Sequence, residues 1–178
     1  MTPRDDRAGN EARIRQLLDD RVKAVRAKDV TAVMTAYAPD VVAFDLAPPP
    51  EYRGAAANRR SLEEWFPTFR GPLGYEIRDL AITAGDEVAF SHSLNRISGA
   101  RTDGTETDVW VRATVCFRRI GGRWAITHEH VSVPFEMTPP FKASLDLKLD
   151  DESTGARSAA RPCSSACRGR PRSRASRP

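Results

Sequence analysis

The feature that most constrains the fold of this chain is a change of hydrophobic pattern at Gly71-Pro72. Before it, apolar residues recur every three or four positions, which is typical of amphipathic helices. After it come four β-rich runs, separated by short turns that contain glycine, at residues 75–83, 87–98, 106–119 and 123–133. Because short turns join antiparallel neighbours, we expect these runs to form a curved antiparallel meander.

Three helical segments are expected before these strands. The first, over residues 10–28, has a single apolar stripe, and Asp29 is placed to cap a second that ends at Pro39-Asp40. A short strand at 41–45 and a rigid loop with three prolines follow, and Pro67 closes the third helix near Phe66. Helices followed by an antiparallel sheet predict an α+β fold, with the three N-terminal helices lying across one sheet face.

The charge of the chain is distributed unevenly. The formal net charge is +4, but residues 153–178 hold seven arginines and no acid, so the rest of the chain is mildly acidic. We expect a flexible N-terminus over 1–9, one domain over 10–149 and a disordered tail rich in Arg, Ser and Pro over 150–178. A nucleic-acid partner would therefore depend on the tail alone. With no apolar run long enough for a membrane span, no signal-peptide pattern and three unbalanced cysteines, we expect a cytoplasmic protein.

Several local motifs resemble those of a known superfamily. They are Lys28-Asp29, Ala38-Pro39-Asp40 and the closing run from Gly122 through Trp124 to His128-x-His130-x-Ser132. In this order they resemble the SnoaL-like branch of the nuclear transport factor two superfamily, which includes ketosteroid isomerases, scytalone dehydratase and polyketide cyclases. The resemblance spans about residues 10–137. It implies a cone-shaped domain that encloses a pocket, works without a metal or other cofactor, and forms a homodimer through the outer sheet face.

Asp45 is the first candidate for chemistry. It ends the short strand before the proline loop, and its separation from Asp29 resembles the spacing of the catalytic base in ketosteroid isomerases. A carboxylate flanked by Phe44 and Leu46 would be partly desolvated, and desolvation raises its pKa toward the range useful to a general base. The alternative is a loop acid that faces water.

The last strand supplies a second candidate. Alternation along it puts His128, His130 and Ser132 on one face, and the resemblance favours His130 as the partner of Asp45 in proton transfer. Each histidine alone has a plain alternative as a hydrogen-bonded strand side chain. A metal site is not expected, since the chain has three histidines and no metal-binding motif.

Other residues are candidates for holding the ligand. Trp110, Arg112 and Thr114 share a face of the preceding strand, where Arg112 either binds a carboxylate or lies in solvent or an interface. Trp65 and Phe69 would be aromatic anchors from the third helical segment.

The match to ketosteroid isomerases is incomplete. Arg21 stands where their oxyanion-stabilising tyrosine would lie, and Thr114 falls near the position of their second oxyanion donor. A steroid isomerase is therefore not expected. We expect instead an isomerase, dehydratase or cyclase that moves protons on a small apolar or carboxylate-bearing carbonyl compound through Asp45 and His130. The alternative is a non-catalytic ligand-binding or dimerisation module.

Overall fold

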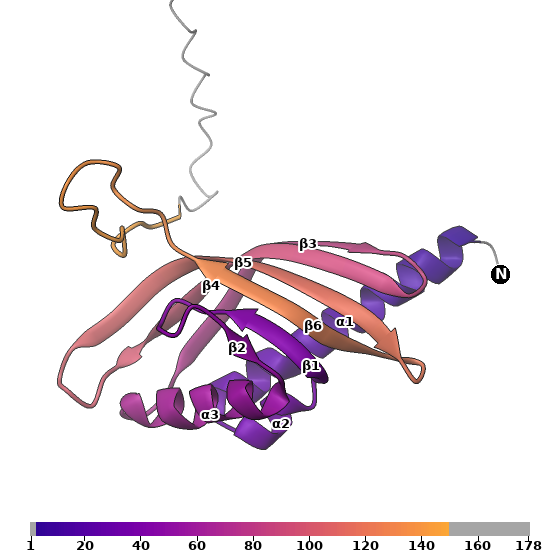
Figure 1. The fold of residues 1–178 in the computed structure, drawn as a ribbon, viewed down its shortest axis with the longest axis horizontal. Coiled ribbons are helices and arrows are strands. Elements are labelled where there is room, and N and C mark those ends of the chain that lie inside the picture. Colours follow the sequence, from indigo (N-terminus) through magenta and orange to yellow (C-terminus); the bar gives the residue numbers. More distant parts are fainter. Residues whose placement is uncertain (1–2, 150–178) are drawn as a thin grey trace, which may run out of the picture.

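The computed structural model of the chain describes residues 3–149, and its longest helix, α1 (Pro3–Arg26), lies across one face of a curved sheet (Figure 1). The apolar stripe of α1 is buried, with Ile14, Leu18 and Val25 at most 2% exposed. The helix begins at Pro3, where a flexible segment over 1–9 was predicted. Proline is tolerated in the first helical turn, so Pro3 does not prevent this early start.

Two shorter helices follow, as expected. The side chain of Asp29 accepts a hydrogen bond from the Ala32 amide and caps α2 (Val30–Met34). This helix ends at Met34, well before the predicted stop at Pro39-Asp40. The next helix, α3 (Ala55–Trp65), passes into a single 3-10 turn, η1 (Phe66–Thr68), which contains Pro67. The predicted interruption at this proline is confirmed.

The second half of the domain is the antiparallel meander that the turn pattern predicted. Its strands are β3 (Gly74–Ala84), β4 (Val88–Ala100), β5 (Glu106–Ile120) and β6 (Arg123–Ser132), each antiparallel to the next. Gly121 and Gly122 join β5 to β6 with φ angles of 56° and 81°, which glycine adopts without the strain that a side chain would introduce.

Two further strands extend the sheet beyond β6. The strand β1 (Tyr37–Phe44) pairs with β6 in parallel, and the short β2 (Tyr52–Arg53) pairs with β1 in the antiparallel sense. The sheet order is therefore β2-β1-β6-β5-β4-β3. Sequence patterns missed β2 and the early start of β1. Pro39 is tolerated in β1 because it falls where the register with β6 shifts, so no regular ladder hydrogen bond is lost there.

The sheet has an inner face, which packs against α1 and α3, and an outer face, which no described element covers among residues 3–149 (Figure 1). The inner face and the helices form one hydrophobic core that includes Val115, Phe117 and Ile126 from the sheet and Phe66 and Phe69 after α3. The fold is thus the expected α+β arrangement.

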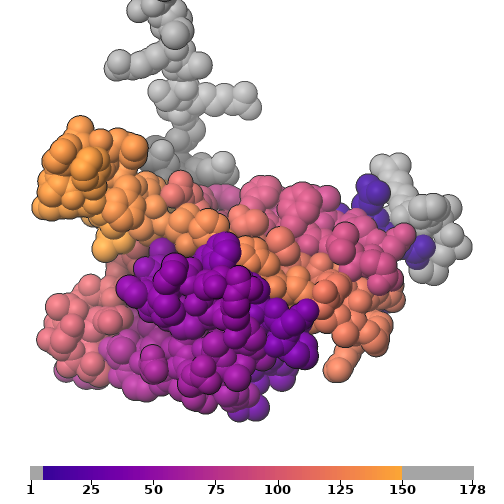
Figure 2. Space-filling model, viewed as in Figure 1, coloured from indigo at the N-terminus to yellow at the C-terminus, as the bar shows by residue number. Residues whose placement is uncertain are grey.

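After β6 the chain forms a closed loop at one end of the molecule (Figure 2), and Lys148 beyond it returns to β5, where its Nζ donates to Oδ2 of Asp108 at 2.7 Å. The loop is held by hydrogen bonds from Ser144 N to Pro134 O and from Glu136 N to Lys142 O, each 2.8 Å. No helix within residues 3–149 is both long and apolar enough to cross a membrane. The expected tail at 150–178 lies outside the described residues.

Candidate functional site

Between the inner sheet face, α1 and α3 lies a cavity of about 300 Å³. Its rim is formed by exposed residues of the loop after β1, 45–48, and by Glu64 of α3. Its walls are largely apolar, and the polar groups come from widely separated parts of the chain: Arg21, Tyr37, Asp45, Tyr52, Asn58, Ser61, Glu64, Tyr75 and Glu129. An apolar hollow with a few polar groups is the usual form of a small-molecule site.

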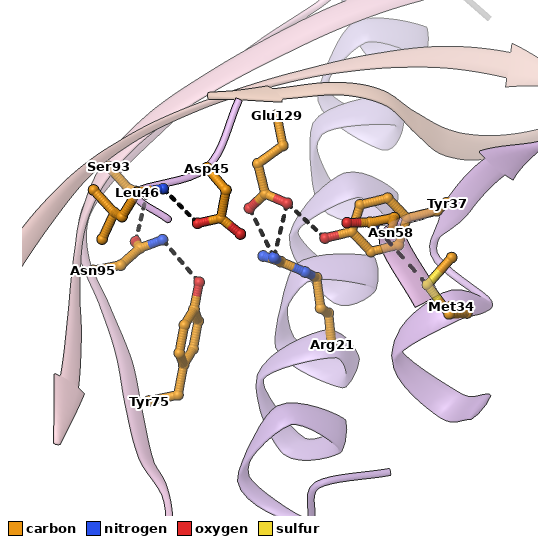
Figure 3. Close-up of polar contacts among 10 residues, drawn as sticks. All are labelled: Arg21, Met34, Tyr37, Asp45, Leu46, Asn58, Tyr75, Ser93, Asn95 and Glu129. Carbon is orange, nitrogen blue, oxygen red and sulfur yellow. Dashed lines mark hydrogen bonds and ion pairs between the residues drawn. The ribbon is translucent and has the colours of Figure 1, made fainter. Parts of the chain in front are cut away.

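A buried ion pair forms the polar floor of this cavity. Nη2 of Arg21, on α1, donates to both carboxylate oxygens of Glu129, on β6, at 2.7 and 3.0 Å, and the two residues are 8% and 7% exposed (Figure 3). The hydroxyl of Tyr37 donates to Oε2 of Glu129 at 2.6 Å. Burial opposes the charge on Arg21, but the attraction of Glu129, together with interactions with Tyr37 and Tyr75, outweighs it and raises the pKa of Arg21 well above its ordinary value. Arg21 is therefore a cation whose charge is already balanced.

Asp45 lies directly after β1, and its carboxyl is turned toward Arg21 and Glu129 (Figure 3). Desolvation raises the pKa of Asp45, and repulsion by Glu129 adds to the effect, while a hydrogen bond of 2.6 Å from the Leu46 amide to Oδ1 opposes it. As a whole the residue is exposed at the rim, so the carboxyl is shielded on its cavity side only. The structure thus brings Asp45 to the cavity, with the desolvation that sequence reasoning expected.

A second set of polar side chains, joined by hydrogen bonds, extends along the inner sheet face from β4 to β3. Ser93 Oγ donates to Asn95 Oδ1 at 2.8 Å, and Asn95 Nδ2 donates to the hydroxyl of Tyr75 at 3.1 Å (Figure 3). All three residues are at most 9% exposed, and Tyr75 lines the cavity. Sequence reasoning singled out none of them.

The structure does not bring His130 to Asp45 in the cavity. His128, His130 and Ser132 share a face, as alternation predicted, but it is the outer face. There His128 Nδ1 lies 2.8 Å from Val42 O, and the ring of Phe44 packs edge-on against both histidines. The residue between them, Glu129, points inward instead.

A β-bulge causes this reversal. Ile126 pairs with Phe117 and His128 with Cys116, so Thr127 is an extra residue in β6. Trp124 and Ile126 are buried in the core, and an unbroken alternation would have put both histidines on their face. Because of the bulge, the two histidines face outward, and Glu129 faces inward with Trp124 and Ile126.

The residues expected to bind the ligand from β5 are also on the outer face. Arg112 and Thr114 are exposed and pair with Ser132 and His130, and Trp110 lies under the guanidinium of Arg78. None of them lines the cavity, so the expected carboxylate site at Arg112 is corrected. Strand alternation fixes which residues share a face but not which face is covered.

Of the two expected aromatic anchors, one lines the cavity and the other does not. Trp65 lines the cavity, whereas Phe69 is 3% exposed in the core behind it and packs edge-on against Trp65, with ring centres 5.6 Å apart. Phe69 therefore supports Trp65 and does not form part of the cavity wall. Within the part of the chain that the structure describes, no group of three or more His, Cys, Asp and Glu residues could hold a metal ion.

One residue that sequence reasoning gave no role carried a usable signal. Arg21 stands three residues after Leu18 and four before Val25, within the buried stripe of α1. An arginine in such a stripe requires a buried acid, which Glu129 provides.

Comparison with known proteins agrees with this architecture. Residues 14–136 match the family model described as a SnoaL-like domain. The chain belongs to the SnoaL-like family. An NTF2-like protein of unknown function from Pseudomonas putida KT2440 is 36% identical to this SnoaL-like chain, with a TM-score of 0.73 and coverage of 80% of this chain and 98% of that one.

More distant structures share the SnoaL-like fold alone. A ketosteroid isomerase-like protein from Erwinia carotovora is 20% identical, with a TM-score of 0.60 and coverage of 68% of this chain and 94% of that one. A candidate dehydratase of the NTF2-like family from Streptomyces avermitilis is 16% identical, with a TM-score of 0.62 and coverage of 74% and 97%. No match to a curated protein is found.

Proposed function

We propose that this SnoaL-like chain binds a small, largely apolar carbonyl compound in its cavity and uses Asp45 as a general base. The observation that carries the proposal is the Asp45 carboxyl, which is turned into an apolar cavity and has its pKa raised by desolvation. A raised pKa brings a carboxylate closer to the proton affinity needed to take a proton from carbon.

The proposed reaction needs no external reagent. Asp45 takes a proton from the carbon next to the carbonyl, and the electron pair of that C–H bond moves toward the carbonyl oxygen to form an enolate. The enolate then reacts in one of three ways, each using the proton held by Asp45: it takes that proton at another carbon, it expels a β-hydroxyl that leaves with that proton as water, or it attacks a second carbonyl of the same molecule, whose oxygen takes that proton. These outcomes are isomerisation, dehydration and cyclisation, and the ketosteroid isomerase-like and candidate dehydratase structures named above share the fold.

The charges around the cavity favour a neutral ligand. Asp45, Glu64 and Glu129 line it beside a single cation, Arg21, whose charge Glu129 already balances. An added carboxylate would meet unpaired negative charge in a poorly hydrated space, which costs free energy. Of the two expected ligand classes, we therefore propose the apolar carbonyl compound and not the carboxylate-bearing one.

A non-catalytic binding protein is the second candidate, and one observation favours it. Proton transfer between two positions is helped by a second group that carries a proton, but His130 lies on the outer face and Glu129 is held by Arg21 and Tyr37. A cavity with a lightly paired Asp45 at its rim and a neutralised ion pair in its floor also suits binding alone.

Exchange of α-protons in D2O, followed by NMR on a panel of neutral ketones, tests the catalytic proposal. We expect Asp45→Asn to slow exchange by about 100-fold or more, because an amide cannot take the proton. Asp40→Asn is the matched control, since Asp40 is exposed and paired with Arg118 outside the cavity. His130→Ala should also leave the rate unchanged.

Two results decide between the candidates. Equal exchange by wild type and Asp45→Asn rejects Asp45 as the base. Binding of the ketones without any exchange by the wild type favours the binding protein.

We also propose that the outer sheet face pairs with a second copy of the chain. That face carries the rings of Phe44 and Phe90, which are 39% and 48% exposed, together with half-buried Trp110. Exposed apolar side chains gathered on one face are typical of an interface.

A further inference from the structure

The three tyrosines of this chain all line the cavity, and the destination of each hydroxyl proton can be followed. A tyrosine hydroxyl donates one hydrogen bond and accepts others. A hydroxyl whose proton is already used within the protein cannot donate to a ligand. A hydroxyl whose oxygen accepts a hydrogen bond from the protein, and whose proton has no acceptor there, can donate to a ligand.

Two of the three protons are in use. Tyr37 donates to Oε2 of Glu129 at 2.6 Å, deep in the floor of the cavity. Tyr52 donates to the carbonyl oxygen of Pro48 at 3.0 Å, within the loop that forms the rim. Neither hydroxyl is free to bind a ligand without breaking a hydrogen bond.

Tyr75 differs, because its oxygen accepts. Asn95 Nδ2 donates to it at 3.1 Å, and Asn95 is held in this orientation because its Oδ1 accepts from Ser93 at 2.8 Å. Asn95 is 2% exposed, so water does not compete for its amide. Among residues 3–149, no acceptor takes the Tyr75 proton. The Tyr75 proton is therefore available to an acceptor in the cavity.

The position of Tyr75 suits this role. It comes from β3, and its hydroxyl is turned toward the side of the cavity where Asp45 and Asn95 lie (Figure 3). Burial raises the pKa of Tyr75 above its ordinary value, although the charge of Arg21 opposes the shift, so the hydroxyl keeps its proton.

We propose that Tyr75, held by Asn95 and Ser93, donates a hydrogen bond to the carbonyl oxygen of the bound ligand. The inference rests on the proposed function, since it assumes that the cavity takes a neutral carbonyl compound. In that reaction the carbonyl oxygen gains negative charge as Asp45 takes the proton, and a fixed donor stabilises the charge where it develops. Tyr75 would then supply this donor from β3.

A neutral ketone dye with a labelled carbonyl, 6-propionyl-2-(dimethylamino)naphthalene carrying 13C at the ketone, provides the test. Binding is followed by fluorescence anisotropy, and hydrogen bonding by the infrared carbonyl band, which moves to lower wavenumber when the oxygen accepts a hydrogen bond. We expect a lowered band in the wild type and its return to the unbonded position in Tyr75→Phe. Affinity should fall by about 2- to 10-fold, the worth of one net hydrogen bond.

Two further variants sharpen the assignment. Tyr52→Phe is the matched control: it removes a cavity hydroxyl whose proton is already donated to Pro48, so the band should stay lowered. Asn95→Asp keeps the shape of the side chain but makes it an acceptor, so it should capture the Tyr75 proton and abolish the shift with Tyr75 still present. Circular dichroism verifies that each variant is folded.

The outcomes separate the two proposals. If the dye binds and Tyr75→Phe keeps the lowered band, the role of Tyr75 is overturned while the cavity remains a ketone site. If no neutral ketone binds the folded wild type, the proposed function fails, and the role of Tyr75 fails with it.

Discussion

Three ionisable side chains in the cavity differ in how completely they are paired. Arg21 and Glu129 neutralise each other, and Tyr37 supplies a further hydrogen bond to the carboxylate. Removing one partner of such a buried pair commonly costs 3–5 kcal/mol, so these residues are expected to hold the site together. Asp45 has a single hydrogen bond, from the Leu46 amide, and this light pairing leaves it available for a ligand.

The same light pairing predicts how Asp45 affects stability. Desolvation raises its folded-state pKa above the ordinary 3.8, so between these two values the folded protein binds a proton that the unfolded chain does not. Stability contributed by Asp45 therefore falls as pH rises through this window. We expect Asp45→Asn to unfold at higher urea concentration than the wild type at pH 7, with the difference closing as pH falls toward 3.8. A less stable variant at pH 7 would contradict the desolvation argument.

At the scale of elements, β6 shows how one inserted residue determines the chemistry of a site. The bulge at Thr127 separates a core section with Trp124 and Ile126 from a section in which Glu129 faces inward. If Thr127 took a regular place in the strand instead of forming a bulge, the two histidines would face α1, and Glu129 would turn away from Arg21.

Sequence patterns predicted most elements but not this reversal. Turn glycines placed the last four strands within two residues of their observed bounds, and Pro67 marked the end of α3. The parallel pairing of β1 with β6 joins distant segments that no local pattern connects. A bulge leaves a weak trace in one sequence, so the outward position of His130 could not be predicted, and alternation along β5 left the face of Arg112 open.

Deletion of Thr127 tests the role of the bulge. The deletion makes Ile126 and His128 consecutive, opposite Phe117 and Cys116, so Glu129 stays on the inner face and keeps its ion pair with Arg21. Glu129→Gln instead leaves Arg21 buried without its acid, so we expect it to lose about 3–5 kcal/mol in the free energy of unfolding by urea, and the deletion to lose much less. A deletion variant as unstable as Glu129→Gln would show that Glu129 depends on the bulge for its inward position.

For the whole molecule, the sheet separates two surfaces of different character. The inner face holds the cavity with its acids, and the outer face holds every histidine of the chain together with Trp110 and exposed phenylalanines. Most residues that sequence reasoning assigned to a ligand belong to the outer face. Their gathering there supports an interface between copies.

This separation predicts that oligomeric state and ligand binding can be changed independently. We expect the wild type to sediment as a dimer, and Phe90→Lys to sediment as a monomer, because an interface that buries Phe90 would have to bury the new charge. The variant should still bind the ketone dye, since Phe90 does not line the cavity. A monomeric wild type would remove the proposed interface.

The Arg21–Glu129 pair also bears on how the protein is made, because it joins residues 108 positions apart, near the two ends of the domain. Synthesis delivers the first helix long before the last strand leaves the ribosome, so Arg21 has no buried acid to meet until translation of the domain is almost finished. Docking of the last strand and formation of the cavity floor are then a single event. A nascent chain that ends before Glu129 lacks the carboxylate that neutralises Arg21.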